Sequence, residues 1–336
     1  MHDFAAWEPA LRALADGVRE RTRAEFARSG PSERERLARP VGRGAGDLTF
    51  GLDVPGEDWI DRWFAARARE GPLSLLTEDR GWRHAGPAGE LAGFDHGGPR
   101  IAVDPVDGTR NLMADLRSAW TVVSFAPPGA GEPRLADLTG GLLGEIATER
   151  AARFRTFVGD GTRCRVEERE VETSALVGAR EAAADADDRV DHGYFPFFRY
   201  EPRLRPALAT LEAEFFARLE REEGADLRSV YDDQYISNAG QLVQLLLGVY
   251  RFVVDARALV ARRAGTSTVT SKPYDVGGAI LCARSAGARL TAADGSPLDF
   301  PIDAVTPVDF AGYANEATRA RLEPHWRATL DDQSYD

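Results

Sequence analysis

Two aspartates stand three residues apart in the run Asp104-Pro105-Val106-Asp107-Gly108-Thr109, directly after an apolar stretch. Side chains alternate along a strand, so Asp104 and Asp107 would face opposite ways on a regular one. Pro105 disfavours the α region at Asp104 and favours a turn, and Gly108 lets the backbone bring the second carboxylate beside the first. Adjacent carboxylates repel each other unless a cation lies between them. The run therefore predicts a site for a hard divalent cation such as Mg²⁺, which takes carboxylate and carbonyl oxygens; the alternative is a surface turn.

Two further carboxylates stand where additional ligands would be needed. Glu78 follows a predicted buried strand at residues 73–77, and a hairpin-like return of the chain would place it beside Asp104. Asp275 begins a segment with helical apolar spacing, residues 275–286. A carboxylate there is favoured by the helix N-terminus, so Asp275 is either an N-cap or a ligand.

The composition bounds the kind of partner. The chain has 336 residues and a formal net charge of −12, which argues against binding a nucleic acid polymer. A small anionic substrate remains compatible, because a bound cation reverses the local field. Cys164 and Cys282 form no disulfide framework, which is typical of a reducing compartment. The sequence begins without a secretory signal and has no tract able to span a bilayer, so we expect a cytoplasmic protein with no membrane partner.

The pattern of apolar residues predicts mixed helices and strands. Helices are expected at 4–18, 59–64, 238–248 and 275–286, and strands at 73–77, 100–104, 118–126, 138–148, 153–158, 162–166, 174–179, 249–254 and 288–291. Residues 80–99 are predicted as a loop, 180–230 are weakly patterned, and the tail after 318 is a last helix or a frayed end. The polar stretch Glu167 to Ser174 predicts two domains, 1–168 and 169–336.

The run at 104–109 resembles the Asp-Pro-(Ile/Val)-Asp-Gly-Thr signature of the inositol monophosphatase family of metal-dependent, lithium-sensitive phosphatases. Thr77-Glu78-Asp79 resembles the family's Gly-Glu-Glu segment, and Tyr274-Asp275-Val276-Gly277-Gly278-Ala279 its Trp-Asp-x-Ala-Ala-Gly segment. Asp47-Leu48-Thr49-Phe50-Gly51-Leu52-Asp53 resembles Asp-Leu-Val-Thr-x-x-Asp, and Ser237-Asn238-Ala239-Gly240 stands near the family's Gly-Ser-Ala-Ala loop. The ordered resemblance runs from about residue 45 to 300. Gly277-Gly278 replaces Ala-Ala, which we expect to loosen the helix start.

The resemblance implies the metal ligands. Glu78, Asp104 and the carbonyl of Val106 would hold one Mg²⁺, and Asp104, Asp107 and Asp275 a second. A third, looser ion would lie near Glu78 and Asp53, giving two or three ions per site, with Mn²⁺ as an alternative metal.

The resemblance also implies catalytic and substrate contacts. Thr109, paired with Asp53, would orient a metal-bound water, and Glu78 would share in catalysis. The backbone amides of Gly108 and Thr109 would hold the phosphate. We expect Asp255 to contact the substrate as well.

The segment 256–274 is longer than the family pattern and contains Arg262 and Arg263. Arginine forks match phosphate oxygens, so these two residues either bind a second phosphate of the substrate or are solvated surface arginines.

The implied fold is a layered α/β (α+β) sandwich, like that of inositol monophosphatase and fructose-1,6-bisphosphatase, with alternating helix and sheet layers. The implied activity is Mg²⁺-dependent hydrolysis of a phosphate monoester of a small polyol or sugar, a small phosphorylated metabolite, by a homodimer. Fructose-1,6-bisphosphatase, 3′-nucleotidase or histidinol-phosphatase activity are the alternatives within this chemistry. A catalytically silent relative that binds metal and phosphate in a regulatory role is the alternative of another class.

Overall fold

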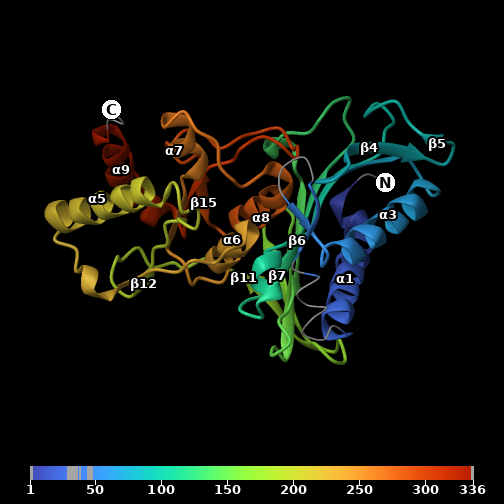
Figure 1. The fold of residues 1–336 in the computed structure, drawn as a ribbon, viewed down its shortest axis with the longest axis horizontal. Coiled ribbons are helices and arrows are strands. Elements are labelled where there is room, and N and C mark those ends of the chain that lie inside the picture. The colour runs from blue at the N-terminus through green and yellow to red at the C-terminus, as the bar shows by residue number, and fades with distance from the viewer. Residues whose placement is uncertain (1–2, 29–36, 38, 44–47, 334–336) are drawn as a thin grey trace.

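The computed structural model describes residues 3–28, 37, 39–43 and 48–333 and is built around one large sheet (Figure 1). Its strand order is β11-β10-β9-β8-β7-β6-β3-β4-β5. The strands are β3 (Leu73–Thr77), β4 (Gly81–Gly86), β5 (Gly89–Glu90), β6 (Arg100–Asp107), β7 (Ala119–Ala126), β8 (Gly140–Ile146), β9 (Arg153–Gly159), β10 (Cys164–Glu170) and β11 (Leu176–Ala182). β3 and β6 run parallel, and the other neighbours pair antiparallel.

Helices cover both faces of this sheet. Figure 1 shows α1 (Phe4–Arg28) and α3 (Val54–Ala68) on one side and α6 (Asn238–Leu246) and α8 (Pro273–Ser285) on the other. Because both faces are covered, every residue of β6 and β7 is buried. Two apolar clusters form, one on each face of the sheet.

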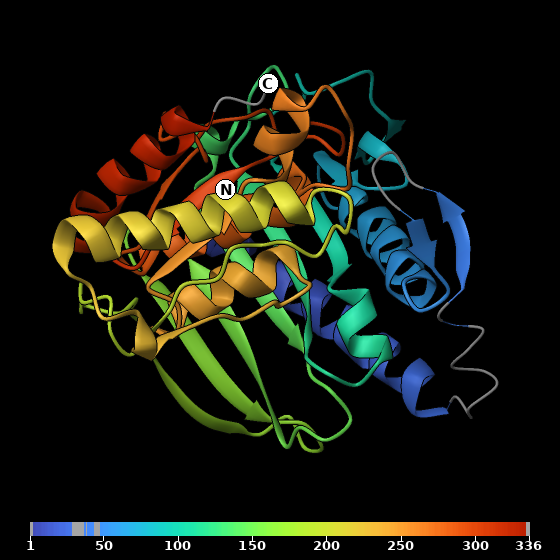
Figure 2. The same ribbon diagram turned by 60° about the vertical axis from the view of Figure 1, so that its left-hand side comes forward.

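A small antiparallel sheet and two helices form the next layers. Its order is β14 (Phe252–Asp255), β16 (Phe310–Tyr313) and β15 (Arg289–Thr291). α5 (Arg205–Glu223) and α9 (Glu316–Asp332) are the outermost helices of this side, which Figure 2 brings forward. The remaining elements are β1 (Pro40–Arg43), β2 (Leu48–Phe50), α4 (Thr109–Met113), β12 (Gly193–Tyr194), β13 (Val230–Tyr231), α7 (Arg257–Arg263) and the 3-10 turns Leu135–Asp137 and Leu227–Ser229.

The glycine pair at the start of α8 brings this helix close to the sheet. A Cβ atom on Gly278 would lie 2.1 Å from the carbonyl oxygen of Val123 in β7, which no side chain tolerates. Gly277-Gly278 was expected to loosen the helix start, but α8 begins regularly at Pro273. The small residues therefore allow a close contact between α8 and β7, which fixes where Asp275 lies.

Most predicted elements are present. The strand at 73–77 and those near 100–104, 118–126, 138–148 and 153–166 are confirmed, as are the helices beginning near 4, 238 and 275. The loop prediction for 80–99 was wrong for residues 81–90, where β4 and β5 form, and agrees with residues 91–99, which form no helix or strand. α5, α7 and β16 were not predicted, and the tail forms α9. The boundary predicted between residues 168 and 169 falls inside β10, and the division into two domains stays a prediction.

No helix in the described ranges is long and apolar enough to cross a membrane.

Candidate metal and phosphate site

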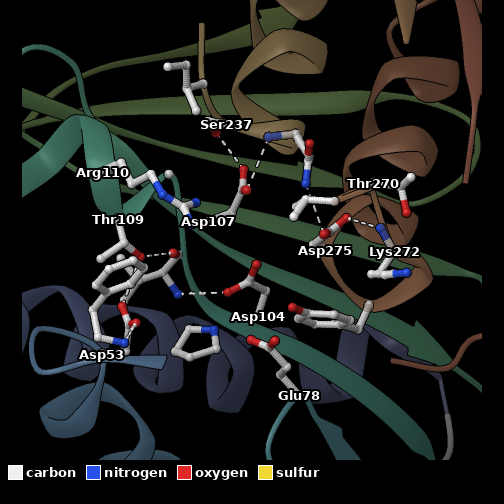
Figure 3. A pocket seen from close by; sticks show the side chains of 18 of the residues that line it. Asp53, Glu78, Asp104, Asp107, Thr109, Arg110, Ser237, Thr270, Lys272 and Asp275 are labelled. Atoms are coloured by element: carbon white, nitrogen blue, oxygen red, sulfur yellow. Dashed lines mark hydrogen bonds between the residues drawn. The ribbon is translucent and has the colours of Figure 1, made fainter. Parts of the chain in front are cut away.

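Glu78 and Asp104 stand at the ends of neighbouring parallel strands. β3 pairs with β6 in a register that sets Leu76 beside Ala102. Continued by two residues, this register puts Glu78 level with Asp104. Both carboxylates line the same pocket of about 90 Å³ (Figure 3). The two residues are therefore brought together by a parallel strand pair, not by the hairpin-like return expected from the sequence.

A bulge in β6 puts Asp107 on the same side as Asp104. Opposite β7, Asp104 pairs with Val122 and Asp107 with Trp120, so β6 contains one extra residue between these pairs. An extra residue reverses the alternation of side chains, and two aspartates three apart then face the same way. The sequence predicted a turn at Pro105, whereas the strand continues through it to Asp107.

The N-terminus of α6 receives the Asp107 carboxylate. Asp107 Oδ1 accepts the backbone N–H of Asn238 (3.1 Å), and Oδ2 accepts the backbone N–H of Ala239 (2.8 Å) and the Ser237 hydroxyl. A helix N-terminus favours a carboxylate because its first N–H groups have no partner within the helix. This contact joins the end of β6 to a helix that begins more than a hundred residues later.

Asp275 lies in the first turn of α8 and has two donors. Its Oδ1 accepts the backbone N–H of Lys272 (3.0 Å), and its Oδ2 accepts the side-chain amide of Asn238 (3.0 Å). The N-cap residue of α8 is Lys272, so the reading of Asp275 as the N-cap was wrong. Asp275 instead accepts the N-cap backbone N–H from the third helical position, and it also lines the pocket with Asp104 and Asp107.

Thr109 and Asp53 form a pair on the side of Asp104 that is opposite Asp275, as Figure 3 shows. Thr109 Oγ1 lies 2.9 Å from Asp53 Oδ1 and 2.8 Å from the carbonyl oxygen of Val106. Asp53 Oδ2 accepts the backbone N–H of Phe50 (2.8 Å). Gly108, with φ of 95°, adopts the left-handed conformation that starts α4 directly after β6.

Burial and mutual repulsion raise the pKa values of the carboxyl groups. Burial raises the pKa of Asp104 well above its ordinary value, and the charges of Asp107, Asp275 and Glu78 raise it further. Burial likewise raises the pKa of Asp275 far above the usual range, with Asp107 adding to it. Burial raises the pKa of Asp53 to about 7. The direction of these shifts follows from carboxyl groups that lie near one another and are buried.

The donor set fits a hard divalent cation. Carboxylate oxygens and a backbone carbonyl are the ligands that Mg²⁺ and Mn²⁺ take, and a cation would remove the repulsion that raises the pKa of Asp104. In the described part of the chain, however, no three His, Cys, Asp or Glu side chains lie close enough together to hold one ion. The oxygens of Asp107 accept hydrogen bonds from the N-terminus of α6. Those of Asp275 accept hydrogen bonds from Lys272 and Asn238.

Most predicted site residues are brought together in this pocket. It is lined by Asp53, Glu78, Asp104, Val106, Asp107, Gly108, Thr109 and Asp275. Asp47, the first residue of the segment 47–53 that resembles the family pattern, lies outside the described residues.

Asp255, Arg262 and Arg263 do not line this pocket. Asp255 is fully buried and paired with Arg257 (2.7 Å), so no surface of it is available to a substrate. Arg262 forms an ion pair with Asp309 (2.8 Å), and its own side chain is 57% exposed. Arg263 donates to the carbonyl of Leu330 (3.0 Å). Within the segment 256–274, residues 257–263 form the helix α7, and neither arginine lines the pocket, which matches the reading of surface arginines. The non-helical remainder contributes Val269, Thr270 and Lys272 to the pocket lining.

Several lining residues were not predicted. Burial, followed by a hydrogen bond with Asp79, raises the pKa of Glu57 to about 9. Glu57 stands one helical turn after Asp53, a spacing that the sequence displays and that could have revealed it. Phe198 and Tyr200 come from the weakly patterned segment 180–230, where a run of aromatic residues was the only sequence feature that could have indicated them. Five other lining residues stand in segments that carry the resemblance but were given no role in the site: Phe50, Pro105, Ser237, Asn238 and Tyr274. The lining residues outside those segments are Arg110, Ile236, Val269, Thr270 and Lys272.

Solved structures share this architecture at low sequence identity. Fructose-1,6-bisphosphatase from Leishmania major is 12% identical, with 98% of this chain and 95% of that chain covered and a TM-score of 0.67. The extragenic suppressor protein suhB from Bartonella henselae is 15% identical, with 96% and 98% covered and a TM-score of 0.61. An inositol monophosphatase from Zymomonas mobilis is 13% identical, with 97% and 99% covered and a TM-score of 0.55.

The fold implied by the sequence motifs is therefore confirmed over nearly the whole chain. No protein-family model and no curated protein sequence matches the chain.

Proposed function

We propose that this protein is a metal-dependent phosphatase that hydrolyses a phosphate monoester of a small polyol or sugar. The observation that supports this most is the convergence of Glu78, Asp104, Asp107 and Asp275 on one pocket, beside the Thr109–Asp53 pair. The pocket lies on a fold shared with solved inositol monophosphatase and fructose-1,6-bisphosphatase structures.

Two cations would account for the ligand set if the carboxyl groups draw closer together than in the described residues, where no three of them lie close enough to hold one ion. Glu78, Asp104 and the carbonyl of Val106 would hold one Mg²⁺, and Asp104, Asp107 and Asp275 a second, with Mn²⁺ as a substitute. Bound there, the cations supply charge for the phosphoryl oxygens and lower the pKa of a bound water. A looser third ion would lie between Glu78 and Asp53, where Glu57 adds a further carboxyl group.

The protein's own groups orient the reactants. Thr109 and Asp53 accept hydrogen bonds from the attacking water and so orient it on one side of the phosphate. The backbone amides of Gly108 and Thr109 bind the phosphate at the left-handed turn that starts α4. No covalent intermediate on the protein is needed.

Phosphate release across a panel of phosphorylated metabolites tests the proposal. Purified protein with Mg²⁺ is expected to release phosphate from a polyol or sugar monophosphate, and Asp104→Asn is expected to abolish this. Preferred release from fructose 1,6-bisphosphate, a nucleoside 3′-phosphate or histidinol phosphate would change the substrate and keep the chemistry. No release from any of them, with metal and phosphate still bound, would favour a regulatory relative.

Inhibition by lithium in the same assay, and a dimeric mass in solution, are further expected outcomes.

A further inference from the structure

Arg257 is an almost completely buried cation at the start of α7, directly behind the pocket. Its side chain is 1% exposed and that of its ion-pair partner Asp255 is 0% exposed. The guanidinium donates to both Asp255 oxygens (2.9 and 2.7 Å) and to the carbonyl of Val269 (3.0 Å), and the Ser271 hydroxyl (3.2 Å) is a longer, shared acceptor at Nη2. Such a buried charge is retained only when its donors are satisfied in good geometry.

One further hydrogen bond links Arg257 to the pocket. Its Nη2 donates to the side-chain oxygen of Asn238 (2.9 Å), and the amide nitrogen of Asn238 donates to Asp275 Oδ2 (3.0 Å). A guanidinium can only donate, so the oxygen of the Asn238 amide must face Arg257. The NH₂ group must then face Asp275, where a carboxylate oxygen accepts it.

The reverse orientation of this amide would be unfavourable on both sides. An Asn238 oxygen turned toward Asp275 would meet a carboxylate, and its NH₂ group would meet a guanidinium. Arg257 therefore determines which way Asn238 points. Because the backbone N–H of Asn238 also binds Asp107, one residue links two of the carboxylates.

Two aromatic rings cover the guanidinium on the pocket side. The Arg257 Cζ atom lies 4.3 Å from the ring centre of Phe198 and 4.9 Å from that of Tyr200, and both rings line the pocket. Stacked arginines of this kind lose side-chain freedom and keep a fixed orientation. The hydrogen bond to Asn238 is accordingly well defined in direction.

We infer that Arg257 is a positioning residue for the Asp275 carboxylate, acting through the amide of Asn238. The inference rests on the proposed function, in which Asp275 is a metal ligand. Outer partners that orient a ligand in this way typically change metal affinity or activity by about 10- to 100-fold when removed.

The test compares Arg257→Met with Arg251→Met. Arg251 is a second buried arginine, paired with Asp185 (2.9 Å) and Asp187 (3.1 Å), and it does not line the pocket. Mn²⁺ affinity, measured by calorimetry on metal-free protein, is expected to fall about 10- to 100-fold in Arg257→Met and to stay at the wild-type value in Arg251→Met. The same ordering is expected for kcat, with KM unchanged.

Two additional variants keep the test decisive if Arg257→Met does not fold. Asp255→Asn combined with Arg257→Met removes both buried charges together, which is less disruptive than removing one, and it still frees the Asn238 amide. Arg257→Lys, which retains the charge and can reach one partner, should restore part of the Mn²⁺ affinity.

A double-mutant cycle tests the route through Asn238. If Arg257 acts through this amide, Asn238→Ala and Arg257→Met together should weaken Mn²⁺ binding no more than the stronger single change. Additive losses, or a raised KM with unchanged kcat, would overturn the inference. A wild-type protein that binds Mn²⁺ but releases no phosphate would contradict the proposed function alone, and Arg257 variants equal to Arg251→Met would contradict this inference alone.

Discussion

Thr109 and Asp53 are joined by a hydrogen bond of 2.9 Å between side chains 56 residues apart in the chain. The Thr109 hydroxyl has one hydrogen but lies near two acceptors, Asp53 Oδ1 and the Val106 carbonyl. Its hydrogen goes to one of these acceptors or is shared between them, and a lone pair that faces neither can accept a hydrogen bond from a water molecule. The pair can hold a water in one orientation beside the carboxylates.

Removing this hydroxyl should slow catalysis without weakening substrate binding. Thr109→Ala is expected to lower kcat by about 10²- to 10⁴-fold, the range for lost proton-transfer or water-orienting groups, with KM close to the wild-type value. Thr109→Ser, which keeps the hydroxyl, is the matched control and should retain most of the activity. A raised KM at unchanged kcat would assign Thr109 to substrate binding instead.

The local part of the site could be predicted from the sequence. Glu78 at the end of a strand and Asp275 at the start of a helix are both set by short-range patterns, and both predictions agree with the elements formed. The motif at 104–109 predicted that two carboxylates lie together. The carboxylates are brought together by a bulge and not by the predicted turn at Pro105. A bulge depends on the pairing of β6 with β7, so the residues of β6 alone do not reveal it.

The contacts between distant segments could not be predicted. Asp107 binds the N-terminus of α6, which lies 130 residues away at Ser237, and no spacing in the sequence indicates that partner. Asp255 was expected to contact the substrate, but it is buried against Arg257, whose guanidinium is fixed by Asn238 from another segment. Pairing of this kind depends on which segments the fold packs together, and the sequence motifs carry no information on it.

A divalent cation should stabilise the folded protein. Asp104 is 9% exposed, and its pKa is raised by burial and by neighbouring negative charges, so its ionised form destabilises the metal-free fold. Mg²⁺ or Mn²⁺ is expected to raise Tm by mass action, and a chelator to reverse this. Differential scanning fluorimetry checks it, and a Tm independent of both cations and chelator would contradict the metal site.

Asp104→Asn sharpens the same experiment. Asparagine can keep the hydrogen bond from the backbone N–H of Val106 (2.9 Å) while removing the buried charge. Its Tm in chelator is expected to exceed that of the wild type, and added Mg²⁺ should no longer raise it. Asp107→Asn should behave differently, because both Asp107 oxygens accept hydrogen bonds and an NH₂ group would face one set of donors. That variant should be less stable than the wild type in chelator.

Gly108 should not tolerate a side chain. Its φ of 95° is unfavourable for any other residue, and a Cβ atom there would lie 2.9 Å from the Ser237 Cβ. The strain alone costs about 1–3 kcal/mol. Gly161, with φ of 87° and no atom near its Cβ position, is the matched control. Gly108→Ala should lower the unfolding free energy more than Gly161→Ala does and should also lower activity; equal losses would mean that the Ser237 contact adds nothing.

Two histidines are expected to make stability depend on pH near neutrality. The backbone N–H of Gly98 donates to His96 Nδ1 (3.0 Å), so the neutral ring carries its hydrogen on Nε2, which donates to the Ser74 hydroxyl (2.7 Å). Ser74 then donates to His84 Nδ1 (2.8 Å). Protonating either ring at its accepting nitrogen breaks one of these hydrogen bonds. Burial, followed for His84 by the nearby His96 charge, lowers the pKa of both rings.

The direction of the effect follows from linkage. A base whose pKa is lower in the folded state binds fewer protons there than in the unfolded chain, so stability falls as pH drops through the unfolded value of about 6.5. The decline ends below the folded pKa values. Buried carboxyl groups such as Asp53 shift in the opposite direction, so the measurement must compare two proteins. We expect the Tm difference between pH 7.5 and pH 5.5, at fixed Mg²⁺, to be smaller in the variant His84→Gln with His96→Gln than in the wild type. An unchanged difference would show that the Ser74 network has no part in the pH dependence.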